Sequence, residues 1–287
     1  MKIGSEAHKE LFCRHFMESH LNYEPEKLSW PQLDGVGLER LRGIPFWEKA
    51  LDTEREAGSL VSAYAQTVRD PVLREAIALQ GVEEARHARL IDTLIKQYGI
   101  EITVRPNVEL PSNLEQAITT FGFEECLDSF FAFGLFDIAR QANFLPEPFF
   151  TMFDPVLDEE ARHIVFFVNW VTYLQINRRQ GAPVLRAAHS LWYYGRALRH
   201  LIEAFGESDT SGAGFTATGA SAFAIDLTPQ MFIDACLQAN ARRMSRFDER
   251  LLQPQLMSAI AKVALSTLQF FSRLKPRTEQ KIRISEQ

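Results

Sequence analysis

The sequence contains few cysteines and no long apolar run. Its three cysteines, Cys13, Cys126 and Cys236, are far apart and odd in number, which argues against a disulfide framework and fits a reducing cytoplasm. No apolar run approaches the roughly 18 residues of a membrane span, and the first residues carry charges where a signal peptide needs an apolar stretch. A net charge of -6 counts against a large nucleic-acid surface. We therefore expect a cytoplasmic protein without nucleic-acid or membrane partners.

Helices are the main pattern in the 287 residues, which are 46% hydrophobic and can bury a sizeable core. Prolines stand where amphipathic periodicity begins, because a first-turn residue needs no N–H partner. Strand signals are few, so we expect an all-α protein. The predicted helices span about 45–68, 71–98, 114–142, 146–177, 183–205, 229 onward and 251 onward.

The chain divides into three parts by pattern. Residues 1–44 are expected to form an N-terminal helical extension, 45–177 the central bundle, and 178–287 C-terminal helices that pack on that bundle in one compact domain. The Gly- and Ser-rich stretch 206–227 has no periodicity and is typical of a flexible loop.

The pentapeptide Glu-Glu-Ala-Arg-His occurs twice, at 83–87 and at 159–163. Each copy contains Glu-x-x-His, and residues three apart share one face of a helix. In both helices that face continues as an apolar seam of the kind that faces a bundle core. Ionisable groups buried there need partners. Two identical pairs on two helices are explained better by metal ions than by two separate ion pairs. The four motif residues are Glu84, His87, Glu160 and His163.

With this doubled motif, the sequence resembles the ferritin-like di-iron carboxylate superfamily, whose four-helix bundle adds one carboxylate from each of two further helices. The resemblance covers about residues 45–177 and implies an antiparallel four-helix bundle with additional N- and C-terminal helices. On the helix before the first motif, the candidates are Glu56 and Glu54. Glu56 would lie level with Glu84 across the hairpin, whereas Glu54 continues the more apolar line of its helix. Aldehyde-deformylating oxygenases of this superfamily are similar here and favour Glu56, which we prefer.

The helix before the second motif offers Glu125, Asp128 and Glu124. We prefer Glu125, which precedes Glu160 by 35 residues, a spacing usual in the superfamily. Asp128 lies one turn on and could instead be a ligand, or a partner of a ligating histidine. The predicted metal ligands are Glu56, Glu84, His87, Glu125, Glu160 and His163, with Glu54 and Asp128 as alternates.

Other polar residues near the motifs receive simpler interpretations. Arg86 and Arg162 are expected to pair with carboxylates, either within the motifs or on a neighbouring helix. We expect the histidines of the N-terminal segment at the surface, namely His8, His15 and His20.

Phenylalanine is abundant and unevenly distributed. Twelve of the 22 Phe residues lie between Phe121 and Phe167. Most are expected to fill the core. Phe149, Phe153 and Phe167 share the seam of the second motif, so we expect them to wall an apolar substrate pocket beside the metal ions.

Carboxylate and imidazole ligands suit iron and manganese. The resemblance implies two Fe ions, with Mn or a mixed Mn/Fe pair as alternatives, and O2 as co-substrate. It implies a di-iron oxidase or oxygenase with no catalytic residues beyond the metal ligands, and the expected Phe-walled pocket favours a small hydrophobic or aromatic substrate. An external electron donor is expected because no flavin or nicotinamide motif is visible, and the chain could pair as a homodimer. The alternatives are a ferroxidase or iron-handling protein and a metal-binding protein without turnover.

Overall fold

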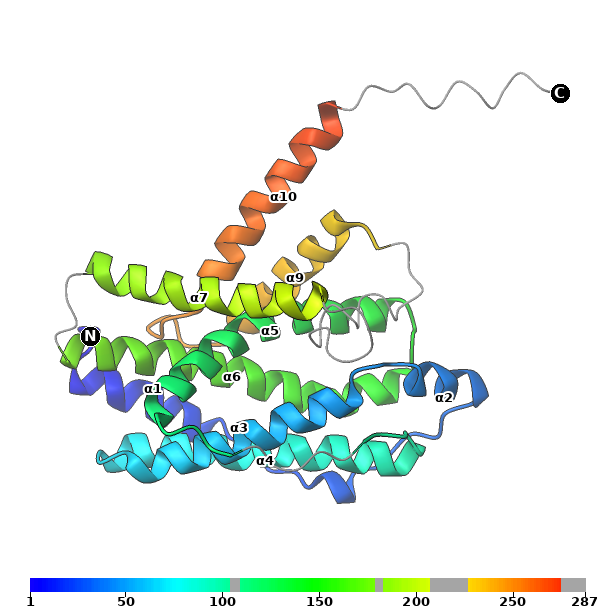
Figure 1. The fold of residues 1–287 in the computed structure, drawn as a ribbon, viewed down its shortest axis with the longest axis horizontal. Coiled ribbons are helices and arrows are strands. Elements are labelled where there is room, and N and C mark those ends of the chain that lie inside the picture. The colour runs from blue at the N-terminus through cyan, green and yellow to red at the C-terminus, as the bar shows by residue number, and fades with distance from the viewer. Residues whose placement is uncertain (104–108, 179–182, 207–226, 275–287) are drawn as a thin grey trace.

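The computed structural model describes residues 1–103, 109–178, 183–206 and 227–274 (Figure 1). Within these ranges every regular element is a helix, which confirms the predicted all-α class. The predicted loop 206–227 lies almost wholly outside the described residues. The elements are α1 (Glu6–Glu18), the 3-10 turn η1 (Pro25–Lys27), α2 (Gly35–Arg42), α3 (Trp47–Thr67), α4 (Pro71–Tyr98), α5 (Leu114–Gln141), α6 (Glu147–Asn177), α7 (Pro183–Gly206), α9 (Pro229–Met244) and α10 (Leu256–Leu274).

Local capping sets the helix boundaries. Asp70 caps α4 by accepting from the backbone N–H groups of Val72 and Leu73, both at 3.0 Å, and Pro71 occupies the first turn. By contrast, α10 begins five residues later than predicted. The backbone N–H of Leu252 donates to Oδ1 of Asn169 at 2.9 Å, so this connection is fixed to α6 before the helix starts.

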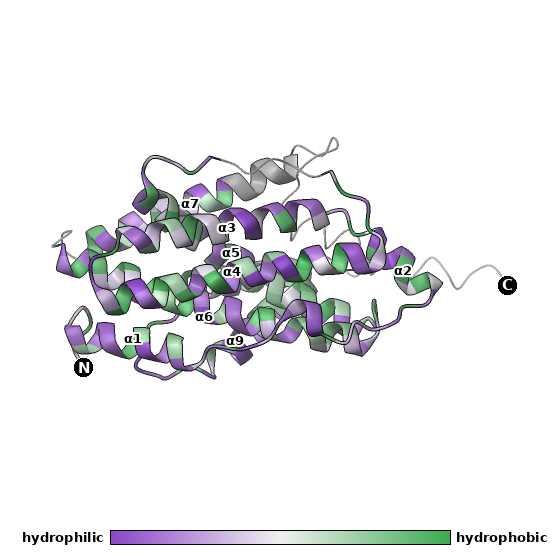
Figure 2. Cartoon of the chain, turned by 90° about the horizontal axis from the view of Figure 1, so that it is seen from below, coloured by the Kyte–Doolittle hydropathy of each residue, from purple (hydrophilic) through white to green (hydrophobic). Residues whose placement is uncertain are grey.

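The helices α3, α4, α5 and α6 form the centre of the molecule. Short connections at 68–70 and 142–146 turn α4 back along α3 and α6 back along α5. Helix α1 packs on α4 and α6, while α7 and α9 pack on α5, and α10 packs on α9 (Figure 1). Hydrophobic and hydrophilic residues are mixed along the helices, as expected when each helix buries one face (Figure 2).

Glycines let α3 and α4 approach closely. A Cβ atom on Gly58 would lie 3.1 Å from the backbone nitrogen of Ala85, and one on Gly81 would lie 2.5 Å from Oγ of Ser62. This close crossing brings the middle of α3 against the first motif on α4.

Two apolar cores lie on either side of the motifs. On α4, Ile77 belongs to one core and Ile91 to the other, and the first motif lies between them. On α3, Val61 and Leu51 are divided in the same way. The polar residues of the motifs are therefore held at the middle of a well-packed bundle.

The N-terminal segment is less exposed than predicted. His8 is fully buried, and its Nε2 lies 2.9 Å from Oδ1 of Asn169 on α6, so its predicted surface position is wrong. The reason is that α1 packs against both α4 and α6.

Among the described helices, none combines the length and apolar character needed to cross a membrane.

Candidate metal centre

Two groups of carboxylates and imidazoles meet between the four central helices. The first group contains Glu54, Glu84, His87 and Glu160, and the second contains Glu84, Glu125, Glu160 and His163. Within each group, one ligand atom per residue lies within 4.8 Å of all the others. Glu84 and Glu160 belong to both groups, so these two carboxylates could bridge a pair of neighbouring ions. The arrangement could hold metal and is compatible with a di-iron site.

Three buried polar atoms at this position have no hydrogen-bond partner: Nδ1 of His87, Nδ1 of His163 and Oε2 of Glu125. Nδ1 of His87 lies 3.1 Å from an oxygen of Glu160, and Nδ1 of His163 lies 3.2 Å from an oxygen of Glu84, both without hydrogen-bond geometry. Buried polar atoms are rarely left unsatisfied. Because these atoms converge on the carboxylates of both groups, metal ligation accounts for their positions.

The two motifs support each other crosswise. Nε2 of His87 lies 2.8 Å from Glu159, and Nε2 of His163 lies 2.9 Å from Glu83. An ionised carboxylate only accepts, so Nε2 carries a proton in each histidine, and in a neutral ring the Nδ1 lone pair would face the site. Such partners orient a ligating imidazole and raise its basicity. The first Glu of each motif thus supports the histidine of the other motif.

The arginines of the motifs complete this crossed arrangement. Arg86 donates to Glu159, and Nη1 of Arg162 donates to Glu83 at 2.9 Å. Arg86 also lies 4.0 Å from Glu83, at the limit of an ion pair. The sequence left open whether the partners lie within a motif or on a neighbouring helix. The close pairs run between helices, because α4 and α6 face each other at the level of the motifs.

The charges of the centre are compatible with bound cations. In the outer pairs, two arginines balance Glu83 and Glu159. The two groups contain four carboxylates in all, with four negative charges when ionised, and two histidines that are neutral when they ligate. Two divalent cations would cancel that charge. Without them, four carboxylates would crowd a buried volume, at an electrostatic cost that proteins avoid.

The pKa values in the metal-free centre reflect this excess of acid. Burial would lower the pKa of His87, but the hydrogen bond to Glu159 and the nearby carboxylates of Glu160 and Glu54 outweigh it and raise the pKa well above its usual range. Burial, aided by the charges of Glu84 and Glu160, raises the pKa of Glu125 well above normal. The pKa of Glu54 rises to about 7, chiefly through burial. Protons therefore occupy, in the metal-free protein, positions that cations could take.

The segment after α1 closes the outer side of the centre. His20 Nδ1 lies 2.5 Å from Glu83, and the Tyr23 hydroxyl donates to Glu159 at 3.1 Å. Arg162 donates to Oγ of Ser19 at 2.9 Å. Sequence reasoning missed these supports, and it also missed the roles of Glu83 and Glu159. The signal available was the repeated Glu at the first position of both motifs.

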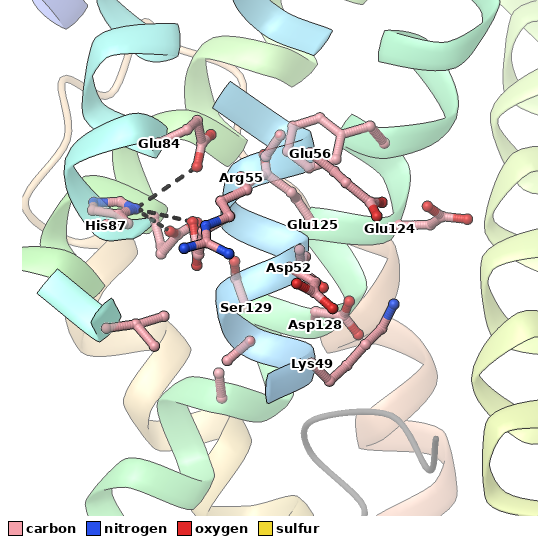
Figure 3. A pocket seen from close by; sticks show the side chains of 18 of the residues that line it. Lys49, Asp52, Arg55, Glu56, Glu84, His87, Glu124, Glu125, Asp128 and Ser129 are labelled. Atoms are coloured by element: carbon pink, nitrogen blue, oxygen red, sulfur yellow. Dashed lines mark ion pairs between the residues drawn. The ribbon is translucent and has the colours of Figure 1, made fainter. Parts of the chain in front are cut away.

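The structure selects Glu54 rather than Glu56 for the position beside the first motif. Oε2 of Glu54 lies 3.6 Å from Nδ1 of His87, whereas Glu56 is exposed and belongs to neither group (Figure 3). Two residues correspond to about 200° of helix rotation, so only one of the pair can face α4. On α5, Glu125 joins the second group, and Asp128 does not.

A cavity of about 1400 Å³ opens beside the centre, and its walls include Glu54, Glu84, His87, Glu125 and Glu160. It continues between apolar side chains of α3, α5 and α6. These include Trp47, Ala50, Ala132, Leu135, Phe136, Ala139, Phe149, Phe150 and Phe153. Charged residues lie at another part of its wall, among them Lys49, Glu56, Glu124 and Asp128 (Figure 3).

The phenylalanines predicted to form a pocket are divided by the structure. Phe149 and Phe153 line the cavity, and their rings stack at 5.1 Å between centroids. Phe167 does not line it. A Cβ atom on Gly122 would lie 2.2 Å from the ring of Phe167, so this ring fills the space between α5 and α6.

Comparisons with protein families, with curated proteins and with solved structures find no match to this chain.

Proposed function

We propose that the protein is a ferritin-like di-iron carboxylate oxidase or oxygenase acting on a small hydrophobic or aromatic substrate. One observation carries the proposal. The orphaned Nδ1 atoms of His87 and His163 converge on two shared carboxylates beside a largely apolar cavity. The donor set, four carboxylates and two imidazoles, suits iron or manganese.

The residues have distinct roles in this proposal. Glu84 and Glu160 would contribute to both metal sites, while Glu54 with His87 would complete one site and Glu125 with His163 the other. When bound, the iron pair would activate O2 by giving it electrons from the external donor, and the activated oxygen would oxidise the substrate. Phe149, Phe153 and their neighbours would bind an apolar molecule and exclude water from the reacting atoms.

Metal content is the first test. Protein purified after growth with iron should contain about two ions per chain. Replacing both His87 and His163 by Ala should abolish tight binding, while the exposed substitution Glu75→Gln on α4 should not change the content. Absence of iron and manganese in the purified protein, together with failure to take up either on reconstitution, would refute the metal centre.

A second experiment separates oxygenation from iron handling. Ala132→Phe should fill part of the cavity while keeping all proposed ligands, and Ala7→Phe on the exposed face of α1 is the size-matched control. An oxygenase should show O2 consumption that a hydrophobic substrate stimulates, and only Ala132→Phe should remove this stimulation. Ferric mineral formation unaffected by Ala132→Phe would indicate a ferroxidase instead. Bound metal with neither activity, across a panel of such substrates, would indicate a metal-binding protein without turnover.

A further inference from the structure

Helix α10 presents an apolar face that no described residue covers. The helix extends away from the body of the molecule (Figure 1), and its first half is anchored through the buried side chains of Met257 and Ala261. Phe270 and Phe271 are each 60% exposed, and Val263 is 69% exposed. Together with Ile260, these residues recur at helical spacing along one side of the helix. An apolar face of this size marks an interaction site.

Helix α7 has a similar exposed face. Trp192 is 57% exposed and its neighbour Leu191 is 58% exposed, although the next two residues, both tyrosines, are buried. Further along the helix, Val184 and Leu198 are also exposed. Gly195 lies between them, and a Cβ atom there would meet nothing within 4 Å. The outward side of α7 is thus apolar and open.

Basic residues outnumber acidic ones on these two helices. The stretch from Leu256 to Leu274 contains Lys262 and Arg273 and no acidic residue. Helix α7 contains three arginines and a single acidic residue, Glu203. The whole chain is acidic, with a net charge of -6, so positive charge is concentrated beside the exposed apolar residues. The sequence after α10 contains Lys275, Arg277, Lys281 and Arg283 against Glu279 and Glu286.

We propose that α7 and α10 bind the surface of an anionic lipid bilayer. Helices with an apolar face, exposed aromatic residues and basic polar positions lie in the membrane interface, where lipid tails cover the apolar face and acidic headgroups attract the basic residues. A second copy of the chain fits less well, because two such faces would bring like charges together. The sequence predicted no membrane partner because it lacks a spanning segment. A protein without such a segment can still bind the surface of a membrane.

The location of α7 gives this contact a consequence for the cavity. Arg196 and Ala197 of α7 also line the cavity, so the proposed lipid-binding face adjoins its wall. If the proposed function holds, a hydrophobic substrate would reach the metal centre from the bilayer. Vesicle binding itself requires neither metal nor turnover, so its failure is distinguishable from failure of the proposed function.

Sedimentation with vesicles tests the proposal. The full chain should bind vesicles of phosphatidylcholine with phosphatidylglycerol, bind vesicles of phosphatidylcholine alone much more weakly, and dissociate as salt increases. Phe270→Ser with Phe271→Ser should weaken binding about tenfold or more, because two largely exposed aromatic side chains would no longer enter the lipid. Lys262→Glu should also weaken binding about tenfold.

Matched controls and a second measurement keep the result decisive. Val36→Ser, at a residue 57% exposed on α2, and Arg14→Glu, at an exposed position on α1, should not change vesicle binding. Circular dichroism should show that every variant is folded. No binding to anionic vesicles, or binding that the Phe variant leaves unchanged, would overturn the proposal. So would light scattering that shows a wild-type dimer which the Phe variant dissociates, because the apolar face would then belong to a second copy.

Discussion

Replacing Glu159 by Gln should weaken binding of the metal ion at His87 and leave the affinity for the ion at His163 nearly unchanged. The carboxylate of Glu159 lies 2.8 Å from Nε2 of His87, and partners of this kind are typically worth about 10–100-fold in metal affinity. Gln preserves the shape of the side chain but lacks the negative charge that makes the imidazole a stronger ligand. We expect one of the two ions to bind about 10–100-fold more weakly.

The same substitution should also destabilise the fold. Arg86 is 4% exposed, and in the variant it would lose its close counter-ion. Breaking a buried ion pair by removing one partner costs about 3–5 kcal/mol. The amide oxygen of Gln can still accept a hydrogen bond, and the guanidinium also stacks 4.3 Å above the ring of Tyr23, so we expect the lower end of that range. Adding Arg86→Met should restore part of the stability without restoring metal affinity.

Calorimetric titration of the metal-free protein with Mn²⁺ measures both ions, and urea unfolding measures stability. Glu83→Gln should instead lower the affinity for the ion at His163 and leave the ion at His87 nearly unchanged. The double variant should lower the affinity for both ions. Glu75→Gln, at an exposed position on the same helix α4, is the control and should change neither quantity. If Glu159→Gln lowers the affinity for both ions equally, or for neither, the crossed support of the histidines is refuted.

Three further predictions follow from the geometry. Glu54→Ala should lower the metal content from about two ions to about one while Glu56→Ala leaves it unchanged; elemental analysis decides, and the reverse pattern contradicts the assignment. Gly134→Ala should lower the free energy of unfolding, measured with urea, by about 1–3 kcal/mol, because its Cβ would lie 2.7 Å from the backbone of Cys236. Gly195→Ala, whose Cβ would meet nothing within 4 Å, should not lower it. The metal-free protein should melt at lower temperature as the pH rises from 4.5 toward 7. In this range the folded state keeps a proton on Glu54, whose pKa is about 7, whereas the unfolded chain has already released it. A constant or rising melting temperature over this range would contradict the prediction.

The motif residues could be placed from sequence because spacing within one helix fixes which side chains share a face. Helices α3, α4 and α6 likewise begin within two residues of their prolines, since capping is a local effect. Spacing therefore sufficed to bring Glu84 and His87 together, and likewise Glu160 and His163, on facing helices.

The choice between Glu54 and Glu56 depended on information that the sequence near them does not contain. Their helix could have been rotated either way by its neighbours, and its rotation is set by the close contact of Gly58 with Ala85. Phe167 illustrates the same limit. It shares a seam with His163, but its ring fills the space beside Gly122, which has no side chain, and therefore does not reach the cavity. Such contacts between distant residues arise only when the helices have packed.

The crossed support of the histidines has a consequence for folding. The hairpin of α3 and α4 contains His87 but not Glu159, and the hairpin of α5 and α6 contains His163 but not Glu83. Neither hairpin alone can therefore build one fully supported site. Tight metal uptake should follow the docking of the two hairpins, so that the ions stabilise the assembled bundle and do not nucleate either half.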